Sequence, residues 1–171
     1  MSSVASNRKA GVLRDGWTAS VDDYALSCEW ALQGSVLMVS DVLGGVKALD
    51  GKSGRTLWES SDTHEGGLLA TSVNPDGTLV ATAGQDGSVL IWDVKSGICI
   101  IRVKIGSDWT EHLAWSHDGA KLAVTCSRKV HVINSDGAEI WKSKSHASTV
   151  SAIKWSKKNE RLREELRKIG Y

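Results

Sequence analysis

The sequence predicts an all-β fold built from a repeat of about forty residues. The first observation is two series of turn glycines, spaced by 43 and 42 residues in one series and by 43 and 40 in the other: Gly34, Gly77 and Gly119, then Gly54, Gly97 and Gly137. The second is that the runs between these turns are short and rich in β-branched residues. Two independent markers with one period indicate a repeat architecture.

Each repeat contains four short predicted strands. In the middle unit, "GTLVATAG" (77–84) and "GSVLIWDV" (87–94) are two of them, and the segments before Pro75 and after Gly97 supply the others. The next unit repeats the pattern with "AKLAVTC" (120–126) and "RKVHVIN" (128–134). Four antiparallel strands in about forty residues is the strand count of a β-propeller blade.

The middle unit also resembles the WD40-repeat family, through "GQDGSVLIWD" (84–93) and a histidine upstream at His64. The resemblance implies a structural hydrogen-bonded set made of His64, Thr82, Asp86 and Trp92. A buried indole N–H needs an acceptor, and a chain of such partners locks adjacent strands together.

The other units depart from that pattern. The third has Gly106 in place of the histidine and Ile133-Asn134 in place of Trp-Asp, and the first has Leu49-Asp50 there. The first unit's "ALDGKSGRTLW" (48–58) resembles quinoprotein-type propellers, in which a fourth-strand tryptophan docks between blades. This resemblance implies docking roles for Trp58 and Trp141. One tryptophan precedes the first turn in each of the first, third and fourth units: Trp30, Trp115 and Trp155.

A fourth unit opens with "SHASTVSAIKWS" (145–156), but a charged segment rich in helix formers follows it. We expect a short C-terminal helix, with Leu162, Leu166 and Ile169 as an apolar stripe for self-association. The predicted fold is a partial β-propeller of about three four-stranded antiparallel blades, plus one strand of a fourth and this helix.

The predicted organisation has three parts. Residues 1–15 are an N-terminal segment, either flexible or an outer strand. Residues 16–157 are WD40-like repeats, with blades at about 16–60, 61–103 and 104–144 and a partial blade at 145–157. Residues 158–171 are the charged helical tail.

An unclosed stack of blades exposes apolar sheet faces and an unpaired strand edge. Three arrangements would cover them. Two copies of about three and a half blades would close a propeller of roughly seven, the helix would cap a monomeric stack, or the chain is a truncated remnant of a longer propeller. The first is the preferred expectation.

Composition excludes some function classes. The net charge of +1 favours neither nucleic acid nor a membrane surface, and no apolar run approaches the length of a membrane span. Three scattered cysteines, Cys28, Cys99 and Cys126, indicate free, buried thiols in a reducing compartment, so we expect a cytoplasmic protein.

No residue set indicates catalysis, a metal or a cofactor. His112, His117 and His131 fall on one predicted unit, but their spacing along extended chain keeps them apart, and we expect exposed side chains. A quinoprotein-like enzyme fragment, which would need a quinone and calcium, is the alternative from another function class.

The predicted function is therefore a non-catalytic protein-interaction scaffold that binds a protein partner. In this fold the binding surface comes from loops over a fixed core. The loops that lead into each blade contain the candidate contact residues Glu65, Asp108, Trp109 and Ser148. Trp109 lies outside the repeated tryptophan positions, and loop aromatics commonly anchor partners.

Overall fold

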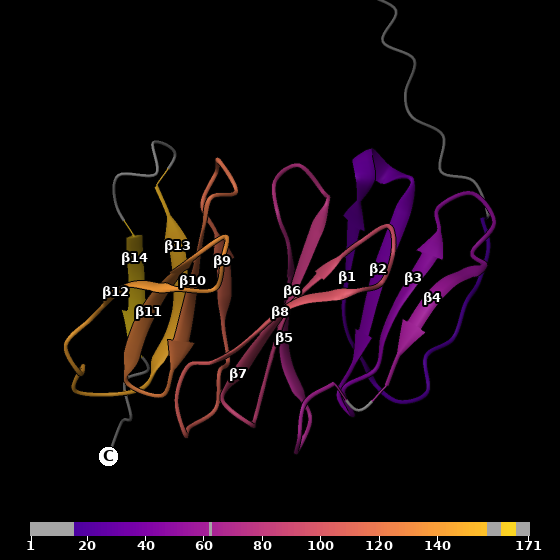
Figure 1. Ribbon diagram of the computed structural model, residues 1–171. Coiled ribbons are helices and arrows are strands. Elements are labelled where there is room, and N and C mark those ends of the chain that lie inside the picture. The colour runs from indigo at the N-terminus through magenta and orange to yellow at the C-terminus, as the bar shows by residue number, and fades with distance from the viewer. Residues whose placement is uncertain (1–15, 62, 157–161, 167–171) are drawn as a thin grey trace, which may run out of the picture.

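The computed structural model describes residues 16–61, 63–156 and 162–166, which form three four-stranded sheets and one two-stranded sheet. Within each sheet, consecutive strands pair antiparallel in chain order (Figure 1). The first sheet contains β1 (Ala25–Ala31), β2 (Val36–Asp41), β3 (Val46–Asp50) and β4 (Thr56–Ser60). The second contains β5 (Leu68–Val73), β6 (Leu79–Gly84), β7 (Ser88–Asp93) and β8 (Cys99–Lys104). The third contains β9 (Leu113–Trp115), β10 (Lys121–Cys126), β11 (Lys129–Asn134) and β12 (Glu139–Lys142), and the fourth β13 (Val150–Trp155) and β14 (Leu162–Leu166).

The core lies between the sheets rather than inside any one of them. Along β6, Val80 packs toward the first sheet, whereas its neighbour Ala81 packs toward the third. Strand β7 alternates in the same way, with Leu90 on one side and Ile91 on the other. Because successive side chains of a strand point to opposite faces, the near-continuous apolar runs of β6 and β7 are what a sheet covered on both faces requires.

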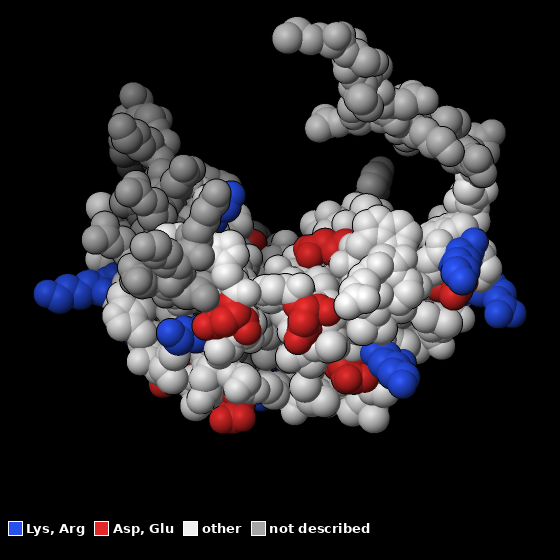
Figure 2. All heavy atoms as spheres, turned by 90° about the horizontal axis from the view of Figure 1, so that it is seen from above, with Lys and Arg blue, Asp and Glu red and all other residues white. Residues whose placement is uncertain are grey.

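The sheets form a curved row. The first strands of successive sheets contact one another, β1 with β5, β5 with β9 and β9 with β13. Seen end-on, the molecule is an arc with one open, concave side (Figure 2). This arrangement places the first strand of each sheet on the inside of the arc and the fourth strand on the outside.

The antiparallel connections create two different edges. The loop edge is formed by the connections within residues 42–45, 61–67, 85–87, 105–112, 127–128 and 143–149. The turn edge, which faces the viewer in Figure 2, is formed by the tight turns within residues 32–35, 51–55, 74–78, 94–98, 116–120 and 135–138. One turn contains a single 3₁₀ turn (Leu32–Gly34), and there is no α-helix in the described ranges.

The expected C-terminal helix is wrong where the structure describes it. Residues 162–166 form β14, which pairs antiparallel with β13 through Trp155 opposite Leu162 and Val150 opposite Leu166. The local helix propensity of these residues favours a helix. However, a short helix is only marginally stable in water, whereas pairing with the free edge of β13 satisfies the backbone N–H and C=O groups of both strands. The fourth unit therefore has two strands rather than one. The rest of the predicted helix, including Ile169, lies outside the described residues.

Tryptophan side chains join neighbouring sheets. The indole N–H of Trp115 donates to the carbonyl of Ser72 at 3.1 Å, and that of Trp155 donates to the carbonyl of Ala114 at 2.8 Å. On the outside of the arc, Trp58 donates to the carbonyl of Val94 at 2.7 Å. Each bond crosses from one sheet to the next.

Trp58 also stacks on Trp92, at 6.4 Å between ring centroids. It therefore docks between sheets as the sequence predicts. Trp141 does not: its side chain is 50% exposed, because the fourth sheet has only two strands in the described part of the chain. Among the described residues no turn receives Trp141, so the structure does not show the docking role predicted for it.

The cysteines differ in their exposure. All three cysteines are free, but only Cys126 is buried, and Cys28 on β1 is exposed. Among the described residues, no helix has the length and apolar character needed to cross a membrane.

Candidate protein-interaction surface

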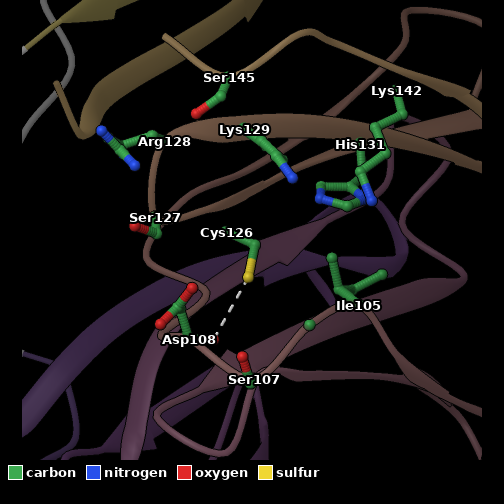
Figure 3. Close-up of a pocket in the computed structure, with 11 residues that line it drawn as sticks. Ile105, Ser107, Asp108, Cys126, Ser127, Arg128, Lys129, His131, Lys142 and Ser145 are labelled. Carbon is green, nitrogen blue, oxygen red and sulfur yellow. Dashed lines mark hydrogen bonds between the residues drawn. The ribbon is translucent and has the colours of Figure 1, made fainter. Parts of the chain in front are cut away.

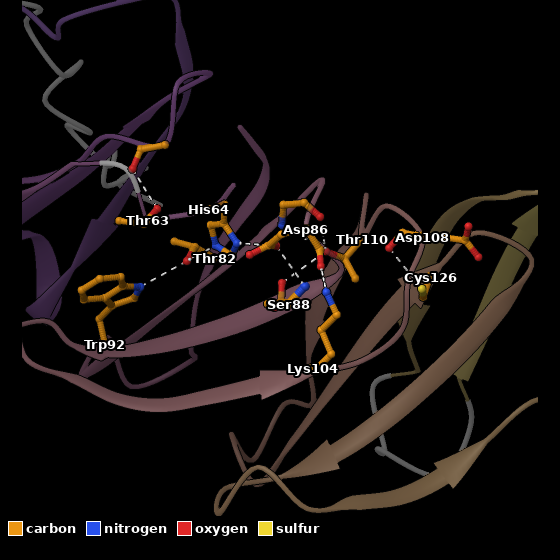
Figure 4. A network of polar contacts seen from close by, with 12 residues as sticks. Thr63, His64, Thr82, Asp86, Ser88, Trp92, Lys104, Asp108, Thr110 and Cys126 are labelled. Carbon is orange, nitrogen blue, oxygen red and sulfur yellow. Dashed lines mark hydrogen bonds and ion pairs between the residues drawn. The ribbon is translucent and has the colours of Figure 1, made fainter. Parts of the chain in front are cut away.

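A chain of hydrogen bonds holds the loop edge of the second sheet (Figure 4). The indole N–H of Trp92 donates to Thr82 Oγ1 at 3.1 Å. Thr82 Oγ1 lies 2.9 Å from His64 Nε2, and His64 Nδ1 lies 3.0 Å from Asp86 Oδ1. The structure thus brings together the four residues that the WD40 resemblance implies.

The protons in this chain have one consistent arrangement. Thr82 accepts from Trp92, so its hydroxyl hydrogen is available to donate to an unprotonated His64 Nε2. The Nδ1–H of His64 then donates to the Asp86 carboxylate, which also accepts the backbone N–H of Ser88 at 3.0 Å. A neutral His64 therefore satisfies every partner.

The electrostatics of the pair agree with that arrangement. Burial lowers the pKa of His64, and this outweighs the opposing effect of Asp86. For Asp86, burial raises the pKa, but the hydrogen bonds from His64 and Ser88 outweigh it and leave the pKa below its ordinary value. The His64 side chain is completely buried, so the set fixes loop 61–67 against turn 85–87 and offers no surface to a partner.

The connection from β8 to β9 is also held in place, by backbone contacts and Thr110 (Figure 4). The buried hydroxyl of Thr110 donates to the carbonyl of Gly84 at 2.7 Å, and the Gly84 N–H lies 3.0 Å from the same hydroxyl oxygen. The Ser127 N–H donates to the carbonyl of Trp109 at 3.3 Å, and the Cys126 thiol donates to that of Asp108 at 3.4 Å. The backbone on both sides of Trp109 is therefore fixed.

Trp109 is 53% exposed despite this rigid backbone. It lines a hollow of about 280 Å³ together with Asp108, Glu111, Ser127 and Thr149. The hollow lies where loop 105–112 meets the loops of the third and fourth sheets. An aromatic side chain on a fixed backbone beside a hollow is suited to anchoring a partner, because the loop loses little conformational entropy on binding.

Of the other three predicted contact residues, one lines this hollow and two do not. Asp108 lines it beside Trp109. Ser148 is half-buried, next to Thr149 in the chain, and does not line it. Glu65 is exposed in a separate loop between the first and second sheets and lines none of the described hollows.

A second hollow, of about 290 Å³, adjoins the first and is lined by basic residues (Figure 3). Arg128, Lys129 and Lys142 are exposed around it, whereas Asp108 is its carboxylate. This cluster is not predictable from the sequence pattern, because Lys142 is distant in the chain from Arg128 and Lys129. The adjacent cations of "SRKV" (127–130) were the available signal.

His131 also lines the basic hollow. The sequence predicted an exposed side chain for His131, and this prediction is wrong. Its side chain is only 2% exposed, and its Nδ1 lies 2.5 Å from Glu139 Oε2 on the next strand. The cross-strand partner of His131, Val124, packs in the core between the second and third sheets, so the His131 side chain is on the face that the second sheet covers. In the described ranges, no three His, Cys, Asp or Glu side chains are arranged to hold a metal ion.

Comparison with known proteins gives a match to a repeat family over part of the chain and a similar fold among solved structures. Residues 54–93 match the family model of the WD domain, G-beta repeat. This match begins in the turn before β4 and ends with β7, so the sequence repeat straddles the first and second sheets.

Several curated proteins are similar over part of the chain. Telomerase protein component 1 of Rattus norvegicus is 32% identical over 95 residues, covering 53% of this chain and 4% of that protein. WD repeat-containing protein AAC3 of Dictyostelium discoideum is 33% identical over 109 residues, covering 63% of this chain and 20% of that protein. A p21-activated protein kinase-interacting protein 1-like protein of Danio rerio is 30% identical over 103 residues, covering 58% and 28%. The chain thus spans less than a third of the length of these relatives.

Two solved structures have a similar fold at 19% sequence identity. The RRP9 WD40 repeats and U3-55K each superpose with a TM-score of 0.73 over 80% of this chain, covering 43% and 44% of those chains. Residues 54–93 therefore carry a WD40 repeat, and the described residues have the fold of part of a WD40 propeller.

Proposed function

We propose that this protein is a non-catalytic, protein-interaction scaffold whose binding surface is the loop edge between the second and fourth sheets. The observation that carries the proposal is Trp109, half exposed on a loop whose backbone is fixed on both sides. One relative that is similar over part of the chain is named for its interaction with a kinase, which supports a binding role in general. The cytoplasm, where free thiols persist, is the proposed location.

The chemistry of the surface defines the partner. Trp109 offers an apolar anchor, and the neighbouring hollow presents Arg128, Lys129 and Lys142. A complementary partner places an apolar side chain over Trp109 and one or more carboxylates toward the basic hollow. We therefore propose an acidic protein segment as the ligand. We also propose that the chain associates with itself.

The test is a comparison of two exposed-residue variants in a binding assay. Peptides selected from a random displayed library against the full chain would be measured by calorimetry with wild type, Trp109→Ala and Ile98→Ala. Ile98 is an exposed apolar residue on the opposite, turn edge and serves as the matched control. We expect Trp109→Ala to weaken binding by at least about tenfold and Ile98→Ala to leave it unchanged.

Charge provides a second arm of the same test. Lys129→Glu should lower the affinity of the protein for those selected peptides that are acidic. This loss of affinity should be smaller at high ionic strength, because exposed charges are screened. Peptides that bind Trp109→Ala as tightly as wild type would contradict the proposed surface.

The alternatives are less well supported. The quinoprotein resemblance rests on "ALDGKSGRTLW" (48–58). The part of it that the structure bears on is the docking of Trp58 against Trp92 and Val94, which is a packing role and gives no support to an enzyme. A remnant without function gives no reason for a fixed, exposed tryptophan beside a basic hollow, so we propose the scaffold instead.

A further inference from the structure

The basic hollow lies in the third sheet at the place where the second sheet has its buried histidine. In the second sheet, His64 packs against the end of β6, since a Cβ on Gly84 would meet the His64 Cβ at 2.5 Å. In the third sheet, Gly106 packs against the end of β10, since a Cβ on Gly106 would meet the Cys126 sulfur at 2.6 Å. Glycine has no side chain, so part of the volume that the imidazole fills in the second sheet is open here. Gly106 and Cys126 both line the hollow.

The backbone around the two places is equivalent. The Gln85 N–H donates to the carbonyl of Gly67 at 3.0 Å, and the Ser127 N–H donates to the carbonyl of Trp109 at 3.3 Å. Each donor directly follows the second strand of its sheet, and each acceptor is three residues after the position compared above. The hollow is therefore produced by a change of side chains on the same loop arrangement.

A buried imidazole faces this hollow. The counterpart of His131 in the second sheet is the apolar Leu90, because both lie opposite the residue two before the end of the second strand. The His131 side chain is 2% exposed and lines the hollow (Figure 3). Its Nδ1 is held by Glu139, whereas its Nε2 has no hydrogen-bond partner among the described residues. Nε2 is thus the ring nitrogen that a ligand in the hollow can reach.

The cations around the hollow are not neutralised within the described chain. Lys129 begins β11, Lys142 ends β12 opposite His131, and Arg128 lies in the turn before β11. None of these three cations forms an ion pair with a carboxylate of the described residues.

The first sheet shows the opposite case. There the counterpart of His131 is Lys47, which also lies opposite the residue two before the end of the second strand. Lys47 pairs with both Asp22 and Glu59, at 3.3 Å each. Two carboxylates of the chain therefore meet the charge at this position in the first sheet, whereas the third sheet leaves its cations for a ligand.

The hollow favours an anion on one side. Among its lining side chains are three cations and one carboxylate, that of Asp108. Figure 3 shows Lys129 and Lys142 extending toward the His131 ring, with Asp108 on the opposite side of the hollow. An anion seated beside His131 would contact both lysines and avoid the aspartate.

A phosphate monoester suits this set of groups better than a carboxylate. It carries a charge of about −1.5 to −2 at pH 7 and three acceptor oxygens, so it can meet both lysines and His131 together. The His131 Nε2 can donate to a phosphate oxygen when the ring is protonated, and accept from a phosphate hydroxyl when the ring is neutral. A carboxylate has one charge and two oxygens, and would leave part of the set without a partner.

The neighbouring hollow indicates the source of the phosphate. Asp108 and Ser127 line both the basic hollow and the hollow beside Trp109, so the two are continuous. A free phosphate ion would occupy only the first, whereas a phosphorylated protein segment can occupy both.

We propose that the basic hollow binds the phosphoryl group of a phosphorylated serine or threonine in a partner protein, while a neighbouring apolar side chain of that partner packs on Trp109. This inference rests on the proposed function and deepens it, because it specifies which acidic group the partner presents.

The first measurement compares three versions of one peptide. Arrays of synthetic peptides with a fixed central phosphoserine or phosphothreonine and varied flanks would be probed with the full chain. The best binders would be made again with phosphoserine, serine or glutamate at the centre and measured by calorimetry. We expect the phosphoserine version to bind at least about tenfold more tightly than the glutamate version. Inorganic phosphate alone should bind at least about tenfold more weakly than the phosphopeptide, because it leaves Trp109 unused.

The second measurement uses variants of the hollow. Lys129→Ala and Lys142→Ala should each lower phosphopeptide affinity at least about fivefold and leave the affinity of the serine version unchanged. Both lysines are exposed, so these variants should fold like wild type. His131→Leu, which places the second sheet's residue in the third, should reduce the preference for phosphate in the same way. Lys95→Ala, at an exposed lysine of the turn edge, is the matched control and should bind like wild type.

Three results would overturn the inference. They are phosphorylated peptides that bind no better than the glutamate versions, a phosphate preference that both Lys129→Ala and Lys142→Ala retain, and inorganic phosphate that binds as tightly as the phosphopeptide. The proposed function would survive each of them if Trp109→Ala still weakened the selected peptides. Phosphopeptide binding that needs both lysines but not Trp109 would instead contradict the apolar anchor, so the two proposals can fail separately.

Discussion

At the scale of single residues, Thr82 is the centre of the hydrogen-bonded chain in the second sheet. Its hydroxyl is the acceptor for Trp92 and the partner of His64, and all three side chains are buried. A residue of the same shape without a hydroxyl would keep the packing and remove both hydrogen bonds. The contribution of these hydrogen bonds to stability can therefore be measured almost separately from that of apolar packing.

We expect Thr82→Val to lower the free energy of unfolding by about 1–3 kcal/mol, because it leaves a buried indole N–H and an imidazole nitrogen unsatisfied. Chemical denaturation followed by circular dichroism measures this. Thr56→Val, on exposed β4, is the matched control and should change stability by less than about 0.5 kcal/mol. Equal effects of the two substitutions would show that the chain contributes nothing.

His64 makes stability depend on pH. Its pKa is lowered by burial from an ordinary value of 6.5, so near and below that pH the unfolded chain binds a proton more readily than the folded protein. Stability is therefore fully present above pH 6.5 and is lost as the pH falls through the lowered pKa. The pKa of Asp86 is also lowered, which adds a further loss below its ordinary value of 3.8.

Unfolding measured between pH 7.5 and 5 should show this fall in wild type and a shallower fall in His64→Gln. Glutamine keeps one donor and one acceptor but takes up no proton in this range. Thr56→Val, on exposed β4, removes no titratable group and is the control, so it should keep the wild-type slope. A wild-type slope retained in His64→Gln would assign the pH dependence to another group.

At the scale of elements, the junction between the first and second sheets depends on Trp58. It stacks on Trp92, donates to the Val94 carbonyl and lies over Gly97. Gly97 has a φ of 72° and a neighbouring ring where a Cβ would lie, so the turn requires glycine for both reasons.

We expect Trp58→Ala to destabilise the fold by on the order of 3 kcal/mol, through lost contacts and a cavity at the junction. Thermal or denaturant unfolding measures this loss. Trp109→Ala removes the same side chain from an exposed loop and should cost less than about 0.5 kcal/mol. Similar losses in both variants would mean that the inter-sheet junction is not where Trp58 contributes.

The elements also show what the sequence can predict. The repeat period placed the strands of the three complete sheets, because turn glycines and alternating apolar residues are local signals. The prediction of a C-terminal helix was wrong for residues 162–166. These residues are good helix formers, but they pair with the free edge of β13, a contact that no local signal encodes. His131 was misjudged for a similar reason, since its burial depends on neighbouring strands.

At the scale of the whole molecule, the candidate surface was only half predictable. Trp109 stood out because it breaks the repeat, and the structure places it beside Asp108 at one hollow. The basic hollow needs Lys142 from β12 beside Arg128 and Lys129, and only the folded third sheet brings them together. Residues that follow the repeat serve its packing, whereas Trp109, which departs from it, lies at the proposed binding surface.

The junctions between sheets have a consequence for how such a chain can change in length. Each complete sheet presents a projecting side chain on one face and a glycine turn to receive one on the other, as Trp58 and Gly97 do. Tandem duplication of a unit such as residues 61–103 would therefore add a sheet while every junction keeps a matched pair. The architecture can gain or lose units in evolution without redesign of its neighbours, and the two outermost docking faces always remain to be matched.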